Sequence, residues 1–98
     1  MKSYAAISIV AIMLLGPAHA SEAEAACKDG VSSESFDGVS AGELEAACEC
    51  MAGEVAGNAA LEQEVIDLSP LPMSERLANA SPELADIAGA CFPEAALQ

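Results

Sequence analysis

The sequence predicts an all-α fold, in which two disulfide bonds hold three to four short helices together in a small domain that follows a cleaved signal peptide. Three observations predict it. Apolar residues recur at helical spacing, helix-capping residues precede these runs, and four cysteines occur in a chain that opens with an export signal. No segment has a convincing strand pattern. We therefore expect helices whose thin common core is reinforced by the cysteines.

The first 20 residues contain the three parts of a signal peptide. Lys2 carries a positive charge, residues 5–15 form an apolar run in which Ser8 is the one polar residue, and residues 18–20 match the small-x-small cleavage pattern. A membrane-spanning helix needs roughly 20 apolar residues, so this shorter run favours cleavage after residue 20 over an anchor. We expect one exported domain, residues 21–98, in the bacterial periplasm or outside the cell.

Cleavage leaves a strongly acidic domain. All 16 carboxylates remain, against the two basic side chains of Lys28 and Arg76, which gives a net charge of −14. This charge opposes binding to nucleic acids, which requires clustered Lys and Arg, and anionic membranes repel it too. A basic protein surface is the one kind of partner that the charge favours.

The start of the mature chain is expected to hold little regular structure. Residues 21–27 are rich in Ala and Glu and are compatible with a short helix or a frayed terminus. Residues 28–39 contain two Asp-Gly pairs and a serine cluster, which predicts a loop. Three apolar side chains are expected to fix this loop to the core: Val31, Phe36 and Val39.

A capping box, Ser40-x-x-Glu43, predicts the start of the next helix. Four residues at spacings of 4, 3 and 4 then share one helical face: Leu44, Cys48, Met51 and Val55. The Gly-Asn pair at 57–58 is expected to end or kink this helix.

Three further helical segments follow. Leu61, Val65 and Leu68 form a second apolar stripe, which stops before the prolines at positions 70 and 72. Residues 74–79 form a short helical turn. The last helix begins at an N-cap serine followed by a proline at the first helical position, and it ends near Pro93. The residues that carry these signals are Ser81 and Pro82, with Leu84, Ile87 and Cys91 on the buried face.

The spacing of Cys48 and Cys50 separates their sulfur atoms. Consecutive helical residues turn by about 100°, so the two side chains point about 200° apart and can neither bond each other nor grip one ion. Cys48 and Cys91 both lie on apolar stripes, whereas Cys50 lies among small residues that would admit the N-terminal segment. We expect the pairs Cys27–Cys50 and Cys48–Cys91. The alternative exchanges the partners of Cys48 and Cys50.

We expect a non-catalytic binding or accessory module with no cofactor. The only histidine, His19, leaves with the signal peptide, which removes Ser-His and Cys-His nucleophile pairs and histidine ligands for zinc. A redox-active dithiol is disfavoured because nearby glutamates raise the pKa of a thiol. The main alternative is a soft-metal protein that binds copper through Cys48, Cys50 and Met51.

Overall fold

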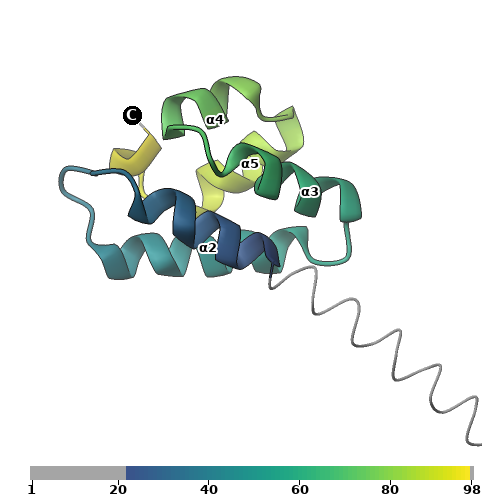
Figure 1. Cartoon of the computed structure of the whole chain (residues 1–98), viewed down its shortest axis with the longest axis horizontal. Helices are drawn as coiled ribbons and strands as arrows, with labels where there is room; N and C mark the ends of the chain where they lie inside the picture. The colour runs from purple at the N-terminus through teal and green to yellow at the C-terminus, as the bar shows by residue number, and fades with distance from the viewer. Residues whose placement is uncertain (1–21, 98) are drawn as a thin grey trace, which may run out of the picture.

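The computed structural model describes residues 22–97, and its regular structure within that range is entirely helical (Figure 1). An N-terminal helix covers residues 22–32. It is followed by α2 (Ala41–Val55), α3 (Ala59–Leu68), α4 (Met73–Asn79), α5 (Pro82–Cys91) and a closing 3-10 helix, η1 (Glu94–Leu97). The all-α prediction is confirmed for this range, with one helix more than expected. The expected signal peptide, residues 1–20, lies outside the described residues.

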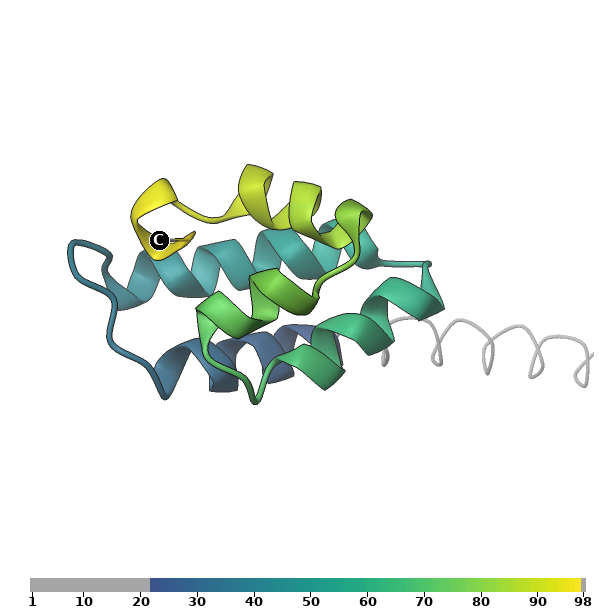
Figure 2. The same cartoon turned by 90° about the horizontal axis from the view of Figure 1, so that it is seen from above.

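The longest of these helices, α2, is the base on which the others pack. The N-terminal helix and α3 lie on one side of α2, and α5 runs along its other side (Figures 1 and 2). The short helix α4 covers the top of this arrangement, between α3 and α5. The buried side chains of all these helices form one apolar cluster.

The predicted core stripe of α2 is confirmed. Its four members are buried, and Cys48 and Val55 are the largest side chains with less than 2% of their surface exposed. Leu61 and Val65 of α3 and Leu84 of α5 are also buried, whereas the other members of their predicted stripes are only partly buried: Leu68, Ile87 and Cys91. The core is therefore built from stripes that the sequence displays.

The predicted loop over residues 28–39 is wrong in its first part, because the N-terminal helix continues to residue 32. Ala23, Cys27 and Val31 recur every four residues and are all buried, so they form a helical stripe that spans the expected boundary. The first Asp-Gly pair lies inside this helix, where Gly30 packs closely against other backbone. Burial of the stripe outweighs the local turn preference of Asp-Gly.

The second Asp-Gly pair does form a turn. The backbone N–H of Val39 donates to the carbonyl oxygen of Phe36 at 3.4 Å, and Gly38 has φ = 77°. A left-handed residue at the third position of a four-residue turn is the type II arrangement that glycine favours. This turn fixes the short loop between the N-terminal helix and α2.

The helix starts follow the predicted capping residues. Glu43 N–H donates to Ser40 Oγ at 3.1 Å, and Ser40 N–H donates to Glu43 Oε1 at 3.0 Å, which completes the capping box of α2. Leu84 N–H donates to Ser81 Oγ at 3.2 Å at the start of α5. Both helix starts were visible in the sequence because these caps are local.

Candidate functional site

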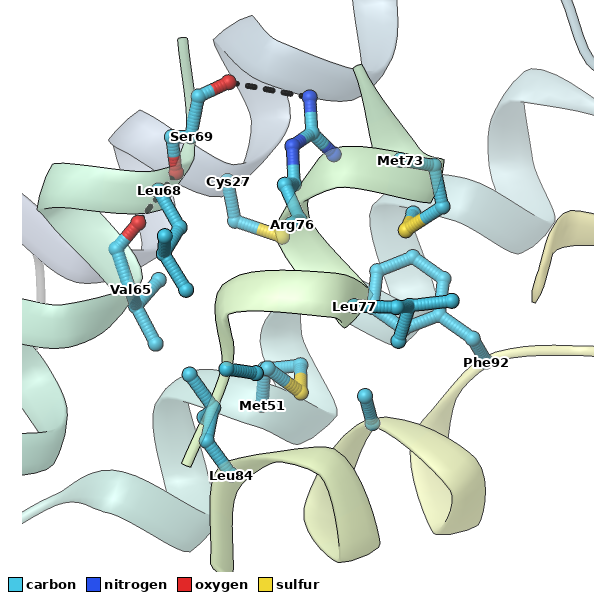
Figure 3. A pocket seen from close by; sticks show the side chains of 12 residues that line it. Cys27, Met51, Val65, Leu68, Ser69, Met73, Arg76, Leu77, Leu84 and Phe92 are labelled. Atoms are coloured by element: carbon cyan, nitrogen blue, oxygen red, sulfur yellow. Dashed lines mark hydrogen bonds between the residues drawn. The ribbon is translucent and has the colours of Figure 1, made fainter. Parts of the chain in front are cut away.

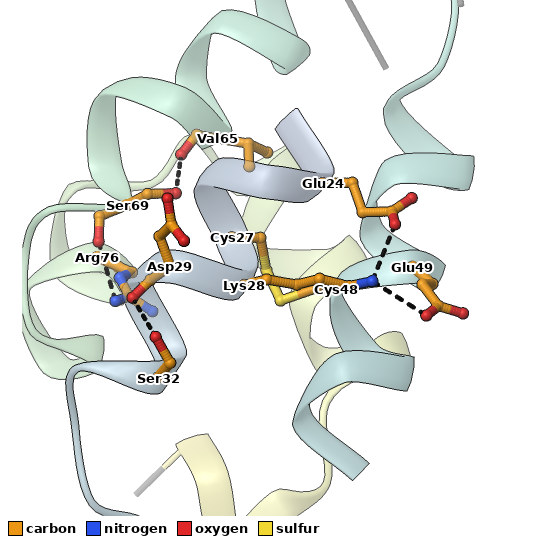
Figure 4. The surroundings of a disulfide bond; sticks show 10 residues. All are labelled: Glu24, Cys27, Lys28, Asp29, Ser32, Cys48, Glu49, Val65, Ser69 and Arg76. Carbon is orange, nitrogen blue, oxygen red and sulfur yellow. Dashed lines mark hydrogen bonds and ion pairs between the residues drawn. A yellow bond between two sulfur atoms is a disulfide. The ribbon is translucent and has the colours of Figure 1, made fainter. Parts of the chain in front are cut away.

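The four cysteines form two disulfides, but with the alternative pairing. Cys27 bonds Cys48, and Cys50 bonds Cys91, each with a Cα–Cα distance of 5.6 Å. The expected pairs, Cys27–Cys50 and Cys48–Cys91, are wrong. The longer N-terminal helix explains the difference: Cys27 lies on its buried stripe and meets Cys48 in the core (Figure 4).

The two disulfides lie in different surroundings. Cys27 and Cys48 are 6% and 0% exposed, so their bond is part of the core. Cys50 is exposed and Cys91 is partly buried, so the bond between α2 and the end of α5 lies at the surface. The predicted separation of Cys48 and Cys50 onto different faces of α2 therefore has a structural consequence: Cys48 lies in the core and Cys50 lies at the surface.

The disulfides also bear on the soft-metal alternative. No cysteine in the described range is free, so Cys48 and Cys50 offer no thiolate in this oxidised state. Met51, the third proposed ligand, is a core side chain that is 6% exposed. Within residues 22–97 no group of three or more His, Cys, Asp or Glu side chains could hold a metal ion. A copper site from these residues would require reduction of both bonds.

Lys28 is one of two basic side chains in the described range, and it is engaged within the protein. Its ammonium group donates to Glu24 at 3.0 Å, one turn earlier, and to Glu49 on α2 at 3.2 Å (Figure 4). Hydrogen bonds to Glu24 and then Glu49 raise the pKa of Lys28. The side chain therefore links the N-terminal helix to α2 beside the buried disulfide.

Arg76, the second basic side chain, is also engaged. Its Nη2 donates to the carbonyl oxygen of Ser69 at 3.0 Å, at the carboxyl end of α3. A Cβ atom placed on Gly30 would lie 2.6 Å from the same nitrogen, so the guanidinium also touches the last turn of the N-terminal helix. Burial lowers the pKa of Arg76, and the charge of Glu34 opposes this. A cation at two helix carboxyl ends is electrostatically favourable.

Within residues 22–97 both cations are engaged, so the accessible surface charge of this range is almost entirely negative. Twelve of the sixteen carboxylate side chains are exposed, three are partly buried, and Glu62 is buried at 5% exposure. The exposed acids are spread over every helix: Glu22, Asp29, Asp37, Glu43, Glu45, Glu49, Glu54, Asp67, Glu75, Glu83, Asp86 and Glu94. The surface can therefore attract cations from most directions.

An apolar cavity of about 50 Å³ lies beneath α4 (Figure 3). Met51, Met73, Leu84 and Phe92 are among its walls, and Arg76 lies at one side. The Nε atom of Arg76 is buried there without a hydrogen-bond partner. This volume is only a fraction of the roughly 300 Å³ at which small-molecule pockets begin, so the cavity is a packing gap in the core.

Two larger hollows flank the loop that follows the N-terminal helix, and they share Glu34 and Phe36. The first, about 300 Å³, lies between the N-terminal helix, the loop and the start of α2. The second, about 340 Å³, lies between the loop, the start of α4 and η1. Phe36 is half-buried, whereas Phe92, the other aromatic side chain in residues 22–97, is 7% exposed.

Two contacts between carboxylates and the starts of distant helices have no signal in the sequence. Both oxygens of Glu34 accept from the backbone N–H of Met73, at 3.1 and 3.3 Å, at the start of α4. The carboxylate of Glu64 accepts from the backbone N–H of Ser81 at 2.5 Å and from its hydroxyl at 2.9 Å. These partners are 39 and 17 residues apart, so no local spacing signals them.

Comparison of the chain with protein-family models, with curated proteins and with solved structures finds no match. Among residues 22–97, no helix is both long and apolar enough to cross a membrane.

Proposed function

We propose that the chain is an exported, non-catalytic binding module whose partner is a basic protein surface. The observation that carries the proposal is the engagement of both cations. Lys28 is paired with two glutamates and Arg76 is half-buried against helix ends, while twelve carboxylates are exposed. A surface of one sign attracts opposite charge and repels its own kind.

Two features support the export and the absence of catalysis. The buried and the exposed disulfide suit an oxidising compartment, where such bonds form and persist. The sequence has no histidine after residue 20, and the described cysteines are all bonded, so common nucleophile pairs are lacking. A small domain held rigid by two disulfides is a suitable scaffold for presenting a binding surface.

The test is a calorimetric titration of the exported, oxidised protein with a hexa-arginine peptide. We expect saturable binding at about 0.15 M salt, where the Debye length is about 8 Å, and tighter binding at about 0.01 M salt. A hexa-glutamate peptide is the matched control and should not bind at either salt concentration. Absence of saturable binding to hexa-arginine at the higher salt concentration would refute the proposed function.

A further inference from the structure

In the part of the chain that the structure describes, the exposed acids are spread widely, but the accessible aromatic surface lies at one end. Phe36 is the half-buried aromatic side chain of the described range, and it lines both of the larger hollows. Aromatic side chains dominate the binding energy of many protein interfaces. The end of the molecule that carries Phe36 therefore combines charge with an aromatic anchor.

The first hollow has an apolar floor and a charged rim. Val31, Phe36, Val39 and Leu44 supply the apolar lining, and the exposed carboxylate of Glu45 lies at the edge. Lys28 also lines this hollow, but its ammonium group is held by two carboxylates. The hollow therefore offers apolar contact beside negative charge.

Another carboxylate lines the second hollow, which shares Phe36 with the first. Asp37 is exposed and lines this hollow together with Phe36. Glu34 lines both hollows, but its two oxygens accept from Met73 N–H, so its charge is already engaged at the start of α4. The carboxylates free to meet a ligand are thus Asp37 and Glu45, one in each of the two hollows that Phe36 lines.

An arginine side chain fits this arrangement. It has an apolar stem that packs on an apolar floor and a planar cation that stacks on an aromatic face and pairs with carboxylates. Lysine shares the charge and the stem, but it has no planar group to stack. A second copy of this chain is a poor occupant, because its own Arg76 is half-buried and its surface is acidic.

We propose that the hollows around Phe36 are the docking site for arginine side chains of a basic partner, with the guanidinium stacked on Phe36 and paired with Glu45 in the first hollow or with Asp37 in the second. This inference rests on the proposed function and adds a location and a preference for arginine over lysine. The turn closed by the hydrogen bond from Val39 N–H to the carbonyl oxygen of Phe36 fixes the backbone of Phe36 and Asp37 before a partner arrives.

The experiment compares hexa-arginine with hexa-lysine on the oxidised protein at about 0.15 M salt. We expect hexa-arginine to bind about two- to fivefold more tightly, the size of an exposed cation–π contact. The Phe36→Leu variant keeps an apolar side chain in the core contact and should lose this preference. Equal affinity for the two peptides, or a preference that survives in Phe36→Leu, overturns the site.

A matched pair of double variants tests the carboxylates. Asp37→Asn with Glu45→Gln should weaken hexa-arginine binding about fivefold or more, since charge-assisted contacts are lost. Glu83→Gln with Asp86→Asn removes the same charge from the exposed face of α5 and should weaken it less than twofold. Equal loss in both variants would mean diffuse attraction and overturn the site while leaving the proposed function intact. No binding by the unmodified protein would overturn both.

Amide chemical shifts locate the peptide on the surface. Titration with hexa-arginine should shift the amide signals of residues 31–45 first. As a control for folding, the thermal unfolding midpoint of each variant should lie within a few degrees of that of the parent protein. Shifts spread evenly over all helices overturn the site. Concentration-dependent dimerisation that shifts the same amides without peptide would assign the hollows to a second copy and also overturn it.

Discussion

The carboxylate of Glu34 caps α4 from 39 residues away, through hydrogen bonds to the backbone N–H of Met73. The local N-cap position is occupied by Pro72, which makes no side-chain capping bond. A helix start without a cap leaves backbone donors unsatisfied. Glu34 therefore ties the loop after the N-terminal helix to the start of α4.

Replacement of Glu34 by Ala should lower the free energy of unfolding by about 1 kcal/mol or somewhat more, the usual cost of a lost helix cap. Glu34→Gln should lower the free energy of unfolding less, because the amide oxygen of the glutamine can still accept from the backbone N–H of Met73. Urea denaturation of the oxidised protein measures both. Asp37→Asn, an exposed acid in the same loop, is the control and should change stability little. Equal stability of Glu34→Ala and the control would contradict the capping role.

Replacement of Gly30 and of Gly53 by alanine should change the stability of the protein in opposite directions. A Cβ atom at Gly30 would lie 2.5 Å from the Ser69 carbonyl oxygen, so the helix must shift, at a cost of about 1–3 kcal/mol. A Cβ atom at Gly53 of α2 meets nothing within 4 Å, and alanine there should stabilise the helix by roughly 0.5–1 kcal/mol. Thermal and urea unfolding of the two variants give the comparison. If Gly30→Ala is as stable as Gly53→Ala, the N-terminal helix does not pack closely against α3.

The Cys50–Cys91 bond should be reduced before Cys27–Cys48. A thiolate must reach a disulfide sulfur to attack it, and Cys50 is exposed whereas Cys48 is 0% exposed. Limiting dithiothreitol, rapid alkylation and peptide mass mapping should label positions 50 and 91 first. In guanidinium chloride, where burial is lost, the two bonds should react at similar rates. Early labelling at positions 27 and 48 in the native protein would contradict the burial difference.

The stabilisation that the charged carboxylate of Glu43 gives to the capping box of α2 should disappear in acid. The backbone N–H of Ser40, and then its hydroxyl, hold the pKa of Glu43 below its ordinary value of 4.5. When the pKa of a carboxyl group is lower in the folded protein than in the unfolded chain, its charge stabilises the fold at any pH above the unfolded pKa. This stabilisation disappears as the pH falls through the folded pKa. The stability difference between the parent and Glu43→Gln should therefore be largest near neutral pH and shrink in acid. A carboxyl titration midpoint at or above 4.5, measured by NMR, would contradict the capping effect.

Local signals in the sequence identified most of the helical structure. The Ser40 and Ser81 caps depend on residues three positions away, and the stripe from Leu44 to Val55 depends on spacings of three and four. Such features are visible without a fold, because the interacting groups are neighbours in the chain. The same rule also separated Cys48 from Cys50 correctly.

The N-terminal helix shows where local signals misled. Asp29 and Gly30 predicted a turn, but the stripe of Ala23, Cys27 and Val31 is buried against the rest of the core. The energy of that burial comes from residues far along the chain, so the local propensity gave the wrong boundary. The expected disulfide pairs were wrong because Cys27, rather than Cys91, is buried beside Cys48. Cys27 is 6% exposed and bonds Cys48, whereas Cys91 is partly buried and bonds the exposed Cys50.

By itself, the sequence determined the helical class, the helix starts and the acidic charge, since each follows from composition or from contacts within one turn. Only the tertiary structure decided which cysteines meet, how Lys28 and Arg76 are engaged, and that Glu34 caps α4. These features join residues from different helices, and their distances depend on how the helices pack. The placement of Phe36 between two hollows belongs to the same group, because it exists only when the N-terminal helix, α2 and α4 are assembled.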